Sequence, residues 1–126
     1  MLKDEIKIIE QILPKICSVD THQSRKGWNP SNPFQGHCAV VSLLVQDILG
    51  GDILWASLEG TQWSGNHYWN LLPDGEEIDF TKSQFGENRP NLKGETRDRS
   101  FLLSSKDTDN KYQILFKRYK EERRRL

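Results

Sequence analysis

A cysteine at the start of an apolar segment is the residue of this sequence best suited to covalent chemistry. Cys38 follows the loop string NPFQGH at 32–37 and opens the apolar run CAVVSLLVQDIL. If this run is a helix, the thiol faces unpaired backbone N–H groups and the positive end of the helix dipole, which both favour the thiolate. The same N–H groups can hold an oxyanion as it develops. The segment therefore predicts a cysteine nucleophile.

A cysteine nucleophile needs a base and a group that orients the base. His67 lies in a segment that is predicted to be a strand, and Asp79 lies in its partner strand beyond the turn residues at 73–75. If the turn contains three residues, Trp69 pairs with Asp79, and His67 becomes a diagonal neighbour of Asp79 on one face. If the turn contains only two, the register shifts by one and His67 points to the opposite face. A triad with Cys38 therefore requires the longer turn.

These three residues predict acyl transfer by a cysteine-dependent hydrolase or acyltransferase. Cys38 would attack an amide, ester or thioester carbonyl, His67 would move the proton, and Asp79 would fix the imidazole. The candidates for a substrate groove are Trp28, Trp63, Trp69 and Asn70. The expected substrate is a small molecule or a peptide, and no cofactor or metal ion is expected.

Two other interpretations of the same region stay open. Its aromatic side chains could line the groove of a non-catalytic module that binds a ligand or a protein, or they could fill the core. These side chains are Trp55, Trp63, Tyr68 and Trp69. A zinc site could use Cys38, His67 and Asp79 with His37, but the close cysteine pairs typical of structural zinc are missing.

The net charge of zero is the sum of two unlike parts. Residues 111–126 contain seven Lys or Arg and two Asp or Glu, and residues 1–110 contain an excess of five acidic residues. The basic end could contact phosphates, but a solvated helix end is the ordinary explanation and Glu121 and Glu122 dilute its charge. We therefore expect no nucleic-acid partner, and the neutral total argues against a polybasic membrane protein.

The length of the chain and its two cysteines indicate a single domain from a reducing compartment. The chain of 126 residues suits one domain, with four tryptophans available for a packed core. It has no apolar run approaching the roughly 20 residues of a membrane span. Residues 1–5 are acidic and amphipathic, unlike a signal peptide. Cys17 and Cys38 without such a signal indicate a reducing compartment, and we expect a cytoplasmic protein without disulfides.

The pattern of apolar residues predicts the elements that position the site. An amphipathic helix is expected over 2–13, ended or kinked by Pro14, and a loop over 18–36. A buried helix follows over 38–49 and stops at the glycines at 50–51. Strands are expected over 53–58, 66–72 and 76–80.

The remainder of the chain carries weaker signals. Thr81 resembles a helix N-cap, with Gln84 placed as in a capping box. Residues 86–100 are polar and irregular, and the apolar run at 101–103 suggests a last strand. Residues 108–124 are expected to be helical. Tyr112, Leu115 and Tyr119 would then share one face.

Several strings between 28 and 86 resemble the YunG-like family of small bacterial proteins. They are Trp28 with Asn32-Pro33, Gly36 to Ala39, Gln46-Asp47 with Gly50-Gly51, and the hairpin from His67 to Thr81. Residues 1–20 and 90–126 resemble it only loosely. The Cys, His and Asp order is also similar to that of transglutaminase-like and papain-like cysteine enzymes, which implies their layout. The glutamine that commonly precedes the cysteine is His37 here. If that glutamine polarises the carbonyl oxygen in the family, the resemblance implies that His37 or Gln35 replaces it, and His37 could instead titrate beside the thiol.

We therefore expect a single α+β domain over residues 1–126, with its characteristic core at 28–86. A buried helix that carries Cys38 should pack on a short antiparallel sheet of about three to five strands. This is the core expected of a transglutaminase-like or papain-like fold. An N-terminal helix and a basic C-terminal helix at 111–126 should flank it.

Overall fold

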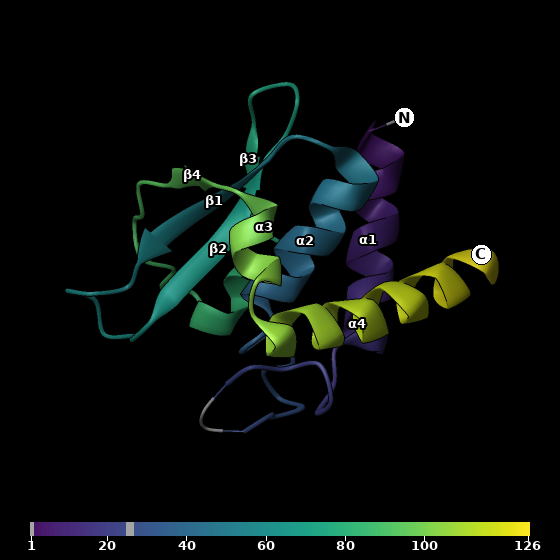
Figure 1. Ribbon diagram of the computed structural model, residues 1–126, viewed down its shortest axis with the longest axis horizontal. Helices are drawn as coiled ribbons and strands as arrows, with labels where there is room; N and C mark the ends of the chain where they lie inside the picture. Colours follow the sequence, from purple (N-terminus) through teal and green to yellow (C-terminus); the bar gives the residue numbers. More distant parts are fainter. Residues whose placement is uncertain (1, 25–26) are drawn as a thin grey trace.

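The computed structural model describes residues 2–24 and 27–126 (Figure 1). Met1, and residues 25 and 26 of the predicted loop, lie outside the described residues. The described chain forms four α-helices, one 3₁₀ helix and four strands. In chain order they are α1 (Leu2–Ile16), α2 (Cys38–Leu49), β1 (Asp52–Ser57), β2 (Asn66–Leu71), β3 (Glu77–Ile78), η1 (Lys82–Phe85), β4 (Glu95–Arg97), α3 (Arg99–Leu103) and α4 (Lys106–Arg124).

The four strands form one antiparallel sheet in the order β3-β2-β1-β4. Helix α2 packs on this sheet and lies between it and α1, while α4 runs across α1 and α2 (Figure 1). The predicted α+β class, with the cysteine-bearing helix against a short antiparallel sheet and helices at both ends of the chain, is confirmed at this level.

The main core lies where α2 meets its neighbours. The side chains of Val40, Leu43 and Leu44 on α2 are each 0% exposed. Burying a side chain of this size stabilises the fold by about 1.5–3 kcal/mol. The predicted apolar faces of α1 and α4 supply the opposing wall. Their core residues are Ile9, Ile12, Leu13 and Ile16 from α1 and Tyr112, Leu115 and Tyr119 from α4.

The boundaries of α2 are as predicted, but those of α1 are not. After Leu49, Gly50 adopts a φ of 78° and its N–H bonds to the Gln46 carbonyl at 2.9 Å. Pro14 does not end α1, which continues to Ile16. Pro14 is exposed and lies in the last turn, so the hydrogen bond that it removes leaves a carbonyl facing water. The buried Ile16 holds that turn against the core.

The segment after 86 was predicted least well. Strand β4 lies within the polar stretch that was expected to be irregular, and it pairs with the free edge of β1. The apolar run at 101–103 belongs to the helix α3 rather than to a strand. In α3, Leu102 is 4% exposed and Phe101 is 54% exposed. A short apolar run does not distinguish helix from strand, and edge pairing is made by backbone groups that leave little pattern in the sequence.

The hairpin of β2 and β3 has the longer turn. The N–H of Leu72 bonds to the Glu76 carbonyl at 2.8 Å, so the turn consists of the residues at 73–75. Asn70 pairs with Ile78, and continuing this register places Asp79 beside Trp69. His67 is then the diagonal neighbour of Asp79 on the same face, as the triad requires.

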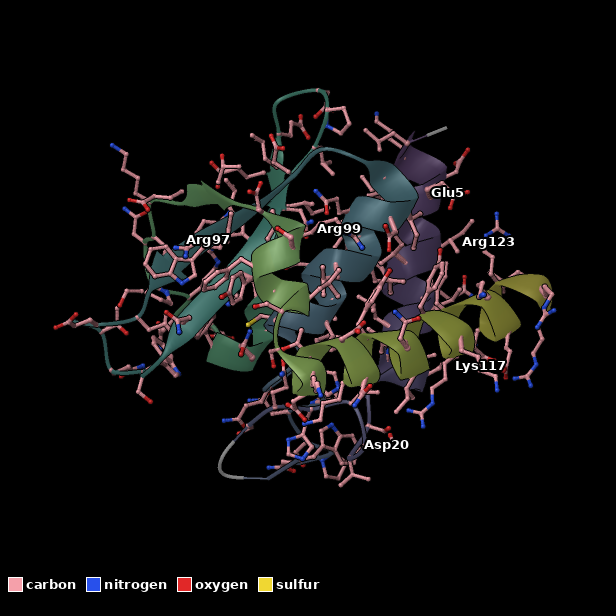
Figure 2. All side chains as sticks on the ribbon, in the orientation of Figure 1. Glu5, Asp20, Arg97, Arg99, Lys117 and Arg123 are labelled. Carbon is pink, nitrogen blue, oxygen red and sulfur yellow. The ribbon has the colours of Figure 1, made fainter. Side chains whose placement is uncertain are left out.

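Ion pairs fasten the basic helix α4 to the N-terminal part of the chain. Arg123 pairs with Glu5 of α1 at 3.2 Å, and Figure 2 shows the two side chains near the ends of their helices. Arg118 pairs with Asp20 and donates to the Ile16 carbonyl at 3.2 Å. Part of the positive charge of the C-terminal segment is therefore neutralised within the fold. None of the helices in the described part of the chain is long and apolar enough to span a membrane.

Candidate active site

Cys38 lies where the long loop meets α2. Its side chain is half-buried, and its Sγ atom is 4.0 Å from the carbonyl oxygen of Asn66, at the start of β2. The first hydrogen bond of α2 runs from the Val41 N–H to the His37 carbonyl at 2.9 Å. The side chain of His37, the N-cap residue, makes no hydrogen bond to the backbone N–H groups of the first turn. These N–H groups of the first turn are therefore placed to face an anion at the thiol.

A glycine fixes the backbone just before the thiol. Gly36 adopts a φ of 80°, and a Cβ atom there would lie 2.5 Å from the backbone nitrogen of Ser24. The Gly36 carbonyl accepts a hydrogen bond from the Gln23 N–H at 2.8 Å. Only glycine fits this close crossing of the two arms of the loop. The start of α2 is thereby held in one place.

The imidazole of His67 is enclosed beside Asp79. Its Nε2 lies 2.6 Å from Oδ2 of Asp79, and because a carboxylate can only accept, Nε2 carries the hydrogen. Burial lowers the pKa of His67, but the hydrogen bond to Asp79 and the hydrogen bond and charge of Cys38 outweigh it and raise the pKa to about 9. Because this pKa lies above 7, the ring is an imidazolium at neutral pH.

Asp79 is held by three further donor groups. Its Oδ2 accepts from Nε of Arg89 at 2.8 Å, and its Oδ1 accepts from the N–H and the hydroxyl of Thr81 at 3.1 and 3.2 Å. Burial raises the pKa of Asp79, but His67 and Arg89 together bring it below its ordinary value. The carboxylate is therefore charged, and it both orients His67 and caps the turn at Thr81.

Gln84 and Arg89 contact the site, and sequence patterns did not identify either of them as functional. Gln84 was predicted to complete a capping box, but η1 has no side-chain cap from Thr81. Instead, Nε2 of Gln84 donates to Oγ1 of Thr81 at 3.1 Å and lies 3.5 Å from Nδ1 of His67. Arg89 comes ten residues after Asp79 in a polar stretch, where no periodic pattern marks it.

His37 faces away from the chemistry that was predicted for it. Its side chain is 0% exposed, with Nδ1 at 3.3 Å from the Gln35 carbonyl and Nε2 at 2.6 Å from Oγ1 of Thr21. Burial lowers the pKa of His37 to about 4, so the ring is neutral. Nδ1 then donates to the carbonyl and Nε2 accepts from the hydroxyl, which engages both nitrogens within the loop. Gln35 takes part in this bond through its backbone.

The predicted groove residues have separate surroundings. Trp69 and Asn70 are each 2% exposed, so their predicted place in an open groove is corrected. Asn70 donates to the Ser42 carbonyl at 3.0 Å and ties β2 to α2. Trp63 is half-buried against Phe85, with ring centroids 4.9 Å apart. Trp28, also half-buried, donates to the Pro33 carbonyl at 3.2 Å and so closes its own loop.

Trp69 instead forms the wall behind the imidazole. Its ring stacks on His67 with centroids 5.5 Å apart, and Phe85 meets His67 edge-on at 4.8 Å. Gly94 lies against the other side of the indole, where an added Cβ would be 2.7 Å from Cζ2 of Trp69 and 3.0 Å from Cβ of Leu54. The orientation of His67 is therefore set by packing as well as by Asp79.

A separate cavity of about 380 Å³ opens on the far side of Asp79, between α1, β3 and η1. Leu13, Phe34 and Phe80 give it apolar walls, and its lining does not include the thiol or the imidazole.

The two cysteines differ sharply in exposure. Both are free thiols, but Cys17 is 3% exposed and burial raises its pKa to about 12. Cys17 is thus an inert core residue, whereas Cys38 is partly open to solvent. Within residues 2–24 and 27–126, no group of three or more His, Cys, Asp or Glu side chains is arranged to hold a metal ion.

The comparisons with known proteins name a family and no function. Neither the curated proteins nor the solved structures contain a match to this chain. The family described as YunG protein matches residues 5–124, which extends beyond the strings at 28–86 into both flanking helices. The chain therefore belongs to the YunG family.

Proposed function

We propose that the protein is a cysteine-dependent hydrolase or acyltransferase that acts on an amide, ester or thioester. One observation carries the proposal: the buried His67 has Asp79 at 2.6 Å from its Nε2, and its hydrogen bonds to Asp79 and Cys38 together raise its pKa to about 9. A histidine placed between a thiol and a carboxylate is the arrangement that activates a cysteine nucleophile. The order of these residues, at a helix start, on β2 and directly after β3, also supports a transglutaminase-like or papain-like layout.

The first half of the reaction forms a thioester on Cys38. The thiol proton resides on His67, and the thiolate sulfur forms a bond to the substrate carbonyl carbon. The electron pair of the carbonyl bond moves to its oxygen, which the N–H groups at the start of α2 stabilise. When the oxyanion collapses, the bond to the leaving group breaks and Nδ1 of His67 gives that group its proton.

The second half releases the acyl group. A water molecule, or an amine in the case of transfer, gives a proton to Nδ1 of His67 and forms a bond to the thioester carbon. The carbon–sulfur bond then breaks and Cys38 leaves as the thiolate. Asp79 holds the Nε2 hydrogen in both halves, so the imidazole keeps the tautomer and orientation that the thiol requires.

The experiment is acylation of the protein with p-nitrophenyl butyrate. Release of p-nitrophenolate measures turnover, and mass spectrometry after an acid quench locates the butyryl group. We expect the group on Cys38 and not on Cys17, since the latter is buried and its pKa is raised to about 12. Cys17→Ala is the matched control and should react like the unaltered protein.

The decisive variant is Cys38→Ala, in which acylation and turnover should both disappear. If this variant hydrolyses the ester as fast as the unaltered protein, the proposed mechanism is wrong. Alkylation of Cys38 by iodoacetamide no faster than that of free cysteine would instead support a non-catalytic binding module on the same scaffold.

A further inference from the structure

The guanidinium of Arg97 contacts two aromatic rings, one on the sheet and one on α3. Arg97 is the last residue of β4, and its Cζ atom is 4.2 Å from the centroid of the Trp55 ring and 4.9 Å from that of Phe101. Figure 2 shows Arg97 over the strands beside α3. Cation–π contacts with two rings restrain a guanidinium without using its N–H groups.

These N–H groups have no partner in the described part of the chain. Arg97 is half-buried, and among residues 2–24 and 27–126 no ion pair or hydrogen bond involves its guanidinium. Arg99, two residues later, shows the contrast, because it pairs with Asp47 at 2.9 Å. A guanidinium held in place with its donor edge unused is suited to a bidentate carboxylate.

The strand register links this cation to the thiol. Arg97 lies opposite Ile53, and Trp55 lies opposite Tyr68, so Arg97, Trp55 and Tyr68 share one face of the sheet. The indole Nε1 of Trp55 donates to the side chain of Asn66 at 2.9 Å.

Asn66 connects this row to Cys38, because its carbonyl oxygen is the atom 4.0 Å from Sγ. The pKa of Tyr68 gives the same picture, since burial and the charge of Cys38 raise it while the charge of Arg97 lowers it. The charges of Cys38 and Arg97 therefore both act on the phenol of Tyr68.

We propose that Arg97 determines the specificity of this site and that the acyl group carried by Cys38 ends in a carboxylate. This inference rests on the proposed acyl-transfer function. The substrate class is a monoester, monoamide or monothioester of a dicarboxylic acid. Its reactive carbonyl binds at Cys38, its carbon chain lies along Tyr68 and its free carboxylate pairs with Arg97.

The inference is tested with two esters whose acyl chains are equally long but end in different groups. The carbon chain of mono-p-nitrophenyl glutarate ends in a carboxylate, and that of p-nitrophenyl valerate, which is equally long, ends in a methyl group. The measured quantity is the ratio of their kcat/KM values for acylation of Cys38. We expect Arg97→Gln to lower this ratio about tenfold, the scale of a partly exposed charge-assisted hydrogen bond.

Two control variants separate specific pairing from general charge. Arg124→Gln removes one exposed cation from the end of α4 and should leave the ratio unchanged. Arg97→Lys keeps the charge without the planar fork and should restore part of the ratio. The corresponding succinate and adipate monoesters then measure the preferred chain length.

The outcomes distinguish the inference from the function beneath it. If Arg97→Gln leaves the ratio unchanged while valerate still acylates Cys38, the inference is overturned and the acyl-transfer function stands. If Arg97→Gln slows both esters equally, Arg97 only supports the fold and the inference is again overturned. If neither ester acylates Cys38 in the unaltered protein, the proposed function itself fails and the inference fails with it.

Discussion

The two histidines nearest to Cys38 are equally buried, but at neutral pH one is uncharged and the other is positive. His37 and His67 are each 0% exposed. Burial lowers the pKa of His37 to about 4, whereas Asp79 and Cys38 overcome burial and raise the pKa of His67 to about 9. A hydroxyl and a carbonyl satisfy the first ring, and a carboxylate polarises the second. The partner, and not the closeness in sequence, decides which histidine can move a proton.

The largest expected effect is a difference in acylation rate between variants of His67 and variants of His37. His67→Gln should lower the rate of Cys38 acylation by p-nitrophenyl butyrate about a thousandfold, the scale of a lost general acid and base. His37→Gln should change it less than about threefold, because both nitrogens of His37 are engaged within the loop. If both variants lose acylation rate equally, the assignment of proton transfer to His67 alone is wrong.

A second change should bring the pKa of His67 closer to that of His37. In Asp79→Asn the burial and Cys38 stay and the carboxylate is gone, so the pKa of His67 should fall clearly below 9. NMR titration of the histidine rings measures this shift. The control is Glu77→Gln, which removes the carboxylate that binds Nε1 of Trp69 at 2.8 Å and should leave His67 near 9. A pKa that stays high in Asp79→Asn would contradict the assigned cause.

The same pair predicts a stability maximum near pH 6.5. The pKa of His37 is depressed in the fold, so its contribution is lost as the pH falls from 6.5 toward 4. The pKa of His67 is raised, so its contribution is lost as the pH rises from 6.5 toward 9. Each window of about 2.5 pH units corresponds to about 3 kcal/mol of unfolding free energy.

Urea denaturation between pH 4 and pH 9 measures both limbs of this curve. His37→Gln should flatten the acid limb and His67→Gln the alkaline limb, whatever each variant does to the stability at pH 6.5. An acid limb that persists in His37→Gln would assign it to other groups.

The smallest expected effect concerns the partner of His37. Thr21→Val leaves Nε2 of the buried ring without the hydroxyl that lies 2.6 Å away. We expect a loss of about 1–2 kcal/mol in urea denaturation and an unchanged rate of Cys38 acylation. Thr96→Val on the exposed face of β4 is the control and should alter neither quantity. A slower acylation in Thr21→Val would connect His37 to the chemistry after all.

Local signals in the sequence were sufficient for the helix start and the hairpin. The glycines at 50–51 and the apolar run before them define α2, and the residues at 73–75 allow the register that joins His67 to Asp79. Each of these features depends on neighbouring residues, whose conformational preferences act within a few positions. The candidate nucleophile Cys38 and its predicted partners could therefore be named from short strings.

The surroundings of the site depend on contacts that short strings do not encode. The ring of His37 faces Thr21, sixteen residues earlier, and nothing in the string around Cys38 indicates that direction. Arg89 reaches Asp79 from an irregular segment, and β4 forms only because the edge of β1 is free. The predicted groove failed for Trp69 and Asn70 because an aromatic or amide side chain on a strand fits either face equally well.

Gly94 is required for the space that it leaves to its neighbours. It has no functional group, yet any side chain there would collide with the indole that backs His67, since a Cβ would lie 2.7 Å from Cζ2 of Trp69. If every amino acid is placed in turn at position 94 and acyl transfer is measured, only glycine should be tolerated there. Position 38 should be equally restricted to cysteine. The position of the imidazole thus depends in part on the absence of a side chain at residue 94, beside the indole that packs on His67.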